Sequence, residues 1–313
     1  MNDGHPRSMG RPGREPFPLD AATTQEWSQL ALSARWSGRC LELVGDPAPL
    51  SQLALLNADY PYELASDWVR GYLDAALEHL LYWANVTAPL VVHADEPVDH
   101  DFRPVQTLSR AAVESAAQAV WILGGNSREE AARRHLCLIR WDISEQRKSL
   151  PVEHKHKMTA VDDALLARVS ARWTAEQLRP PTYLDVIRSS CRTIKRDPAE
   201  AEALWRASAG SAHGKRWPSL ALRNYTVGEE YQPGQHRTQA IPDPEAMTAV
   251  LKLADGFVTW GVQKFLEWSG ADYPTVHAQV HEWLAGIIPL KEESQRGELV
   301  SENPFASRDE APS

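Results

Sequence analysis

Apolar residues recur along almost the whole chain at the spacing of three and four that places them on one face of an α-helix. Residues 61–84 show the pattern clearly, with Trp68, Leu73 and Leu77 on a single face. Gly124 and Gly125 end one such segment, and Asp197 followed by Pro198 begins another. The pattern predicts helices over residues 61–84, 104–123, 128–150, 158–178, 183–195, 198–214, 244–268 and 273–287. We therefore expect an all-α fold, a bundle of seven to eight helices.

The helical pattern is interrupted over residues 216–242, where glycine, proline and scattered β-forming residues replace it. This segment is expected to be a long irregular loop or a small hairpin, and the sequence does not choose between them. No Gly/Ser-rich linker divides the rest, so residues 19–290 are expected to form a single helical domain. Residues 1–18 and the acidic residues 291–313 have too little apolar content to offset the entropy of ordering, so both are expected to be disordered tails.

The composition is that of a globular protein. The 313 residues are 43% hydrophobic and 24% charged, which excludes a collagen, a coiled-coil rod and a wholly disordered chain. The longest uncharged apolar stretch, residues 80–92, is too short to span a bilayer. The three cysteines are widely spaced and indicate neither a disulfide framework nor a metal site. These features predict a soluble, cytoplasmic protein that does not enter a membrane.

Charge is distributed unevenly along the chain. Residues 128–223 hold 19 Lys and Arg against 12 Asp and Glu, although the whole protein has a net charge of -9. A basic middle segment in an acidic protein can contact a phosphate backbone. The alternative is that these charges lie on solvated helix faces, with no polyanion involved.

One pair of residues in the predicted helix 198–214 points to chemistry. Arg206 and His213 are seven residues apart, close to two helical turns, so they share a face about 10 Å apart along the axis. An arginine can hold a phosphate and stabilise a negative transition state, while a histidine can take the proton of a 2′-hydroxyl or protonate the leaving oxygen. This pair would support cleavage of RNA without a metal.

Arg206, six intervening residues and His213 near the end of a helix resemble the motif of the HEPN superfamily. The chain also resembles helical proteins common in actinobacteria that combine an R-A-x-x-E helix, here Arg110 to Glu114, with a later S-x-x-H-G, here Ser211 to Gly214. The resemblance implies a metal-independent ribonuclease acting as a toxin or a phage-defence effector. Its partners would be RNA and an antitoxin-like protein. Because a motif that spans about 10 Å on one helix holds few groups around a phosphate, a homodimer that brings two copies together is also expected. Ala207 departs from the superfamily, which usually has a polar residue after the arginine.

Further residues join this candidate site. Glu114 is expected to orient His213 or hold Arg206, provided that helix 104–123 packs on helix 198–213. Arg110 is four residues before Glu114, and the alternative is a structural ion pair between them. Lys215, Arg216 and Trp217 follow His213 and are candidate substrate-binding residues, in which the tryptophan stacks on a base or simply anchors the loop.

No cofactor or metal is predicted. His277 and His281 have the i,i+4 spacing of zinc ligands, but no third ligand accompanies them. The chain has no Walker loop, no G-x-S-x-G and no G-x-G-x-x-G that opens a strand–helix unit. Two classes of function therefore stay open: a HEPN-like endoribonuclease, and a non-catalytic helical protein that binds a protein or a polyanion.

Overall fold

The computed structural model describes residues 19–90 and 102–288, and these form eleven α-helices, one 3-10 turn and one two-stranded sheet. The elements in order are α1 (Ala21–Leu43), α2 (Gln52–Asp59), α3 (Ala65–Thr87), α4 (Phe102–Leu123), α5 (Arg128–Ser149), η1 (Val152–His154), α6 (Lys155–Val169), α7 (Tyr183–Thr193), α8 (Pro198–Ala212), α9 (Arg216–Ala221), β1 (Arg223–Gln232), β2 (Gln235–Pro242), α10 (Pro244–Ser269) and α11 (Tyr273–Ile287). The largely helical class expected from the sequence is confirmed. The expected number of helices is wrong.

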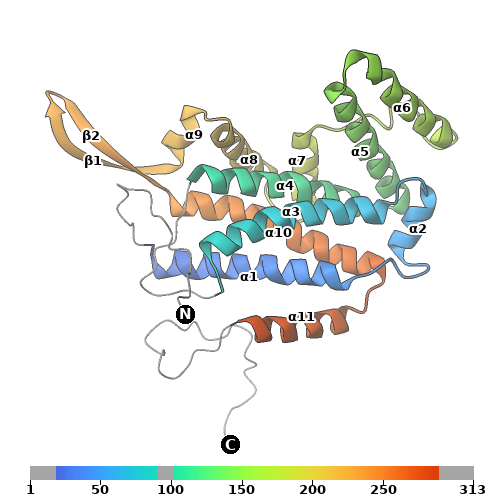
Figure 1. Cartoon of the computed structure of the whole chain (residues 1–313), viewed down its shortest axis with the longest axis horizontal. Coiled ribbons are helices and arrows are strands. Elements are labelled where there is room, and N and C mark those ends of the chain that lie inside the picture. Colours follow the sequence, from blue (N-terminus) through green and yellow to red (C-terminus); the bar gives the residue numbers. More distant parts are fainter. Residues whose placement is uncertain (1–18, 91–101, 289–313) are drawn as a thin grey trace, which may run out of the picture.

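Helix α4 lies at the centre of the bundle. It packs against α3 and α10 on one side and against α7 and α8 on the other, while α1 completes the layer beside α3 and α10 (Figure 1). Its many alanines explain this position, because Ala112, Ala116 and Ala119 are fully buried and let neighbouring helices come close. The hydroxyl of Ser190 on α7 donates to the carbonyl of Ala117, 2.7 Å away. Helix α4 is thus the core of the fold.

The sequence pattern did not predict three of the helices, α1, α2 and α9. Helix α1 is capped by Asp20, whose carboxylate accepts from the backbone N–H of Thr23 at 2.6 Å. Its buried positions include alanines, a serine and an arginine, so the apolar stripe is weak. Helix α9 has only six residues, below the length at which periodicity is informative.

The predicted helix over residues 158–178 is wrong in its second half, since α6 ends at Val169. Residues 170–182 form a loop whose carbonyl groups are bonded by arginines of α5. Arg140 donates to Ala175 and Leu178, and Arg133 donates to Gln177, over distances of 2.9 to 3.0 Å. These bonds satisfy loop carbonyls that a helix would otherwise satisfy internally.

Residues 216–242, left open as a loop or a hairpin, contain α9 and an antiparallel hairpin of β1 and β2. The hairpin projects from one end of the bundle, while α5 and α6 rise at the other end (Figure 1). Helix α11 packs on α1. The tails expected at residues 1–18 and 291–313 lie outside the described residues.

Candidate functional site

Helix α8 begins and ends as its sequence indicates. Asp197 caps it by accepting from the backbone N–H of Ala199 at 2.9 Å, and Pro198 takes the first turn. The helix stops because Gly214 adopts a left-handed φ of +68°. Gly210 lies where α9 folds back onto α8, and a Cβ there would lie 2.8 Å from Pro218 and 3.3 Å from the indole of Trp217. The glycine therefore allows α9 to pack against the last turns of α8.

Arg206 is held in an ion pair and stays open to solvent. Its Nε donates to Glu202 at 2.7 Å, one helical turn earlier, and its side chain is 55% exposed. Arg188 of α7 donates to the other oxygen of Glu202 through Nε, at 2.8 Å, and through Nη2. The hydrogen bonds from Arg206 and then from Arg188 hold the pKa of Glu202 below its ordinary value.

One carboxylate thus faces two guanidinium groups, which leaves one positive charge in this cluster without a counter-charge. Both Nη atoms of Arg206 lack a hydrogen-bond partner among the described residues. A guanidinium oriented through Nε with its two Nη groups free is a suitable arrangement for a phosphate. The pairing of Arg206 with Glu202 through Nε therefore leaves both Nη groups available for a phosphate.

His213 is the C-cap residue of α8 and is exposed. Its backbone N–H donates to Ala209 at 3.1 Å. Its ring makes no hydrogen bond, ion pair or ring contact in the part of the chain that the structure describes. With about 1.5 Å of rise per residue, His213 and Arg206 lie about 10 Å apart along the helix.

Glu114 does not reach His213. It accepts from the Nε1 of Trp205 at 2.7 Å and from the Nε of Arg110 at 2.8 Å, and both side chains of the ion pair are largely buried. The indole of Trp205 lies near the guanidinium of Arg110, at 5.8 Å, and near that of Arg206, at 5.9 Å. The packing of α4 on α8 predicted from the sequence is confirmed. In that packing Glu114 contacts Trp205. The carboxylate beside Arg206, where Glu114 was expected, is that of Glu202.

The direction of the two helices explains why Glu114 and His213 are apart. Gln106, two turns before Glu114, accepts at 2.5 Å from the hydroxyl of Ser208, which lies beyond Trp205 on α8. The two helices therefore run in opposite directions where they touch, and His213 lies beyond the Gln106 end of the contact. Glu114 is connected to Arg206 through Trp205, which donates to Glu114 and lies beside the guanidinium of Arg206.

Lys215, Arg216 and Trp217 are exposed at the start of α9. Trp217 rests against Gly210 and is still 50% exposed, so the anchoring role and a free stacking face coexist in one side chain. Together with Arg206 and His213, these residues define what we call the α8–α9 surface. It carries four cationic or titratable side chains and one aromatic ring.

About half of the cations in the basic middle segment form ion pairs within the molecule. Nine of its 19 Lys and Arg form ion pairs: Arg128, Arg133, Arg134, Arg140, Lys148, Arg172, Arg179, Arg188 and Arg206. These nine charges therefore have counter-charges within the molecule. Only the α8–α9 surface combines exposed cations with a titratable ring and an exposed indole in the region that sequence reasoning selected.

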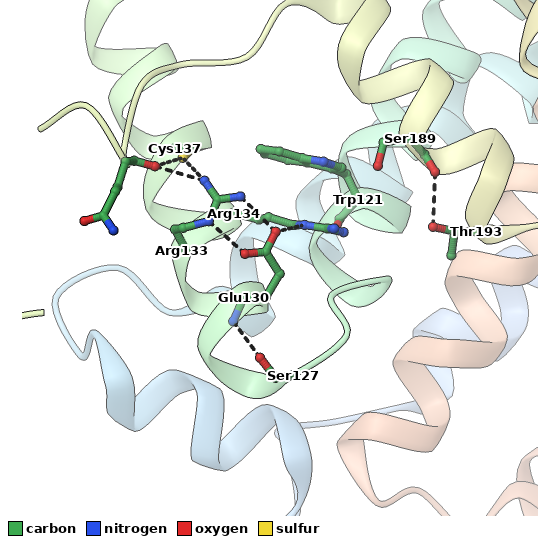
Figure 2. A network of polar contacts seen from close by, with 9 residues as sticks. Trp121, Ser127, Glu130, Arg133, Arg134, Cys137, Ser189 and Thr193 are labelled. Atoms are coloured by element: carbon green, nitrogen blue, oxygen red, sulfur yellow. Dashed lines mark hydrogen bonds and ion pairs between the residues drawn. The ribbon is translucent and has the colours of Figure 1, made fainter. Parts of the chain in front are cut away.

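Figure 2 shows the best-connected of these ion-pair clusters. The carboxylate of Glu130 accepts two bonds from Arg133 and one from Arg134, all at 2.8 Å. Arg134 also donates to the carbonyl of Trp121 on α4 at 2.7 Å. The hydrogen bonds from the arginines, that of Arg133 first, lower the pKa of Glu130 to about 2. This cluster joins α4, α5 and the loop 170–182 and is structural.

Two hollows in the described part of the chain lie away from the α8–α9 surface. One, of about 480 Å³, is lined by α1, α8 and α10 and mixes acidic and basic side chains; the other, of about 350 Å³, lies between the end of α4 and α10. Neither contains Arg206 or His213. Within residues 19–90 and 102–288, no three His, Cys, Asp or Glu side chains gather as metal ligands. His277 lies between the rings of Trp36 and Tyr273.

All three cysteines, Cys40, Cys137 and Cys191, are buried free thiols. Among the described helices none is both long enough and apolar enough to cross a membrane. Comparisons with protein-family models, curated proteins and solved structures found no significant match.

Sequence reasoning missed the roles of Trp205 and Arg188. Trp205 is the hydrogen-bond donor that connects Glu114 to α8. Arg188 lies on a different helix, and only the packing of α7 on α8 brings it to Glu202. No pattern in the sequence of either helix alone would have indicated that contact.

Proposed function

We propose that the protein is a metal-independent endoribonuclease that cleaves single-stranded RNA at the α8–α9 surface, as the resemblance to the HEPN superfamily implies. The observation that carries the proposal is the exposure of Arg206 and His213 and the polar atoms that both leave unbonded. Both are exposed on one helix, the arginine with free Nη groups and the histidine with a free ring. Residues serving only the core would be buried or fully bonded.

In the proposed reaction the 2′-oxygen of a ribose attacks the adjacent phosphorus and the bond from phosphorus to the 5′-oxygen breaks. His213 removes the 2′-hydroxyl proton or delivers a proton to the departing 5′-oxygen. Arg206 stabilises the extra negative charge on the phosphorus oxygens. The products are a 2′,3′-cyclic phosphate and a free 5′-hydroxyl, and no metal is required.

The remaining residues hold the substrate. Lys215 and Arg216 contact neighbouring phosphates, and the exposed half of Trp217 stacks on a base. Arg110 is a weaker substrate ligand than the sequence suggested, because its Nε is bonded to Glu114. Glu114 and Trp205 together position Arg206 from behind.

The 10 Å between Arg206 and His213 is wide for a single phosphate, so we propose that two copies of the chain act together. In this reading the protein is a cytoplasmic toxin or phage-defence effector, and an antitoxin-like partner protein inhibits it by covering the α8–α9 surface. A cover of acidic character would suit the exposed cations there.

The test is cleavage of a labelled single-stranded RNA in the presence of EDTA, with detection of the cyclic phosphate end. We expect His213→Ala to lower the rate on the order of 10²–10⁴-fold, the usual contribution of an acid–base group. Arg206→Ala should also lower the rate, and Arg206→Lys should restore little, since lysine lacks the planar fork. His154→Ala, an exposed histidine on η1, is the matched control and should retain the wild-type rate.

An inactive wild-type protein, or a His213→Ala variant of full activity, would overturn the proposal. Melting temperatures of all variants separate catalysis from stability, because both residues are exposed and neither change should unfold the protein. If both variants melt several degrees lower and the wild type cleaves no RNA, the pair is structural.

A second candidate is a non-catalytic binding protein. The internal pairing of nine cations in the basic segment favours it, because this pairing weakens the case for a nucleic-acid surface. RNA bound by the protein and recovered intact after long incubation would favour a polyanion-binding role. No RNA binding at all would leave a protein partner as the ligand.

A further inference from the structure

The hairpin of β1 and β2 stands away from the helical bundle (Figure 1). Every residue of β1 after Arg223 is exposed, and neither strand pairs with a third strand within the described residues. The turn is tight, with Gly234 at a left-handed φ of +73° and its N–H bonded to the carboxylate of Glu230 at 2.6 Å. A two-stranded hairpin without further cover is only marginally stable in water.

The hairpin also exposes apolar side chains. Tyr225 is 43% exposed and Val227 is 66% exposed, and Leu220 of the adjoining helix α9 is 52% exposed. The hydroxyl of Tyr225 donates to the carbonyl of Ser219 at 2.7 Å, which fixes the root of β1 against α9. The root is therefore fixed against α9, while none of the residues that the structure describes covers its apolar face.

Over residues 224–227 the free edge of β1 lacks the charged residues, prolines and bulges that protect natural sheets from pairing, while a bulge and two glutamates follow at residues 228–230. It contains no lysine and no proline over ten residues, whereas β2 ends in Pro242. Edge strands without such features tend to pair with another strand. The edge of β1 is therefore the more open of the two.

The register of the hairpin shows which side chains of β1 share a face. Arg223, Tyr225, Val227 and Glu230 lie opposite Pro242, Ala240, Thr238 and His236, respectively. Those β2 partners are two residues apart, so they point to one face, and residues directly opposite in an antiparallel ladder point to the same face. A bulge at residues 228–229, where two β1 residues oppose Arg237, brings Glu230 onto that face.

We propose that the edge of β1 pairs with β1 of a second copy of this chain, in antiparallel orientation about a two-fold axis at Thr226. The two hairpins then form one four-stranded sheet. Tyr225 of each copy packs beside Val227 of the other, Arg223 lies beside Glu230 of the other, and Thr226 meets Thr226. The pattern of β1 is self-complementary, as an interface between identical copies requires.

The charged residues Arg223 and Glu230 of β1 favour a second copy of the chain as the partner of this edge. Within the described residues Arg223 has no carboxylate partner and its buried Nε has no hydrogen bond, and its guanidinium lies over the ring of Phe102 at 5.1 Å. Glu230 likewise has no cationic partner in the described part of the chain. Within one copy the two are about 20 Å apart along the strand, too far to pair. A second copy supplies each with its counter-charge.

This inference goes beyond the proposed function, because pairing of the hairpins does not require RNA cleavage by either copy. It names a specific interface, and the interface can be tested without RNA. The first readout is the mass of the full chain by light scattering after gel filtration. We expect about 70 kDa, twice the 35.0 kDa of one chain.

The second readout is a disulfide at the two-fold axis. Thr226→Cys places two thiols directly opposite each other, where Cβ atoms are about 4.5–5.5 Å apart. Mild oxidation should give a covalent dimer on a non-reducing gel. Thr238→Cys is the matched control: its copies would be separated by three strand spacings, about 14 Å, and should not link. The native cysteines are buried and should not contribute.

The third readout is a charge exchange. Arg223→Glu and Glu230→Arg each place like charges together and should shift the protein toward monomer, and the double variant should restore the dimer. Glu230→Gln, which keeps an oxygen for Gly234, controls for damage to the turn. Arg237→Glu, on the opposite face, should leave the dimer intact.

A monomer at every concentration overturns the proposal. So does a dimer in which Thr226→Cys and Thr238→Cys link equally, or in which the charge-exchange variant is no better than its parents. RNA cleavage by a dimer that fails the disulfide and charge-exchange tests would leave the proposed function standing, with its two copies joined at another interface.

Discussion

Replacement of Glu130 by glutamine should destabilise the protein through the cluster in Figure 2. The carboxylate holds two arginines, and each arginine also bonds a backbone carbonyl of another segment, that of Gln177 or of Trp121. Glutamine keeps the size of the side chain and removes its charge. The variant therefore tests the ion pairs with little change in packing.

The pKa of Glu130 sets the scale of the effect. Its fall from 4.5 to about 2 corresponds to an upper limit of about 3.4 kcal/mol, at about 1.36 kcal/mol for each pKa unit. The side chain is 29% exposed, so solvent screening reduces this value. We expect the variant to lose about 1.5–2.5 kcal/mol of unfolding free energy at pH 7, and a few degrees of melting temperature.

The effect should depend on pH in a defined direction. Because the folded-state pKa is depressed, the contribution of Glu130 is complete above about pH 4.5 and is lost as the pH falls toward 2. Urea unfolding of both proteins at pH 7 and near pH 3 should show that the difference shrinks to less than half. Glu176→Gln, which removes an exposed partner of Arg179, is the control and should change stability little. Equal stability of wild type and Glu130→Gln at pH 7, or a difference in unfolding free energy that is the same at pH 7 and pH 3, would refute the reasoning.

Three further predictions concern buried positions. Gly210→Ala should lower the melting temperature by several degrees, because its Cβ would meet Pro218 at 2.8 Å; a variant as stable as the wild type would show that α9 shifts without cost. Burial raises the pKa of Asp255 above its ordinary 3.8, so Asp255→Asn should gain stability relative to the wild type as the pH of thermal melts rises from about 4 to 8, and no change in that difference would contradict the prediction. Burial beside Trp68 lowers the pKa of His135 to about 3, so the wild type should lose about 2 kcal/mol between pH 7 and pH 5 through this group, and His135→Phe should lack that loss in urea titrations.

The sequence predicted most of the helices because local signals mark them. The caps at Ser127 and Asp197 and the left-handed Gly214 are contained within a few residues, and the helix boundaries near them are confirmed. The helix over residues 158–178 failed because its second half is held open by arginines of α5, a contact made between segments far apart in the chain. Periodicity carries no information about such contacts.

In the candidate site, too, the local contacts could be predicted from the sequence and the contacts between helices could not. The pairing of Arg206 with Glu202 is an i,i+4 contact and could be read from the sequence, as could the pair of Arg110 and Glu114. That Glu114 meets Trp205 and not His213 depends on the direction in which α4 crosses α8. A one-dimensional pattern shows that two helices can pack closely, but it does not show their relative direction.

The sharing of carboxylates gives the uneven charge of the sequence a structural cause. Asp59, Glu130 and Glu202 each bind two arginines, and in all three cases the arginines belong to the basic middle segment. A segment built on such trios must contain more arginine than acid, whatever it binds. For proteins of this kind a local excess of positive charge in the sequence can therefore come from carboxylates that each bind two arginines, within one helix at Glu130 and between elements at Asp59 and Glu202. Nucleic-acid binding should be inferred only from the cations that remain after these carboxylates have been assigned.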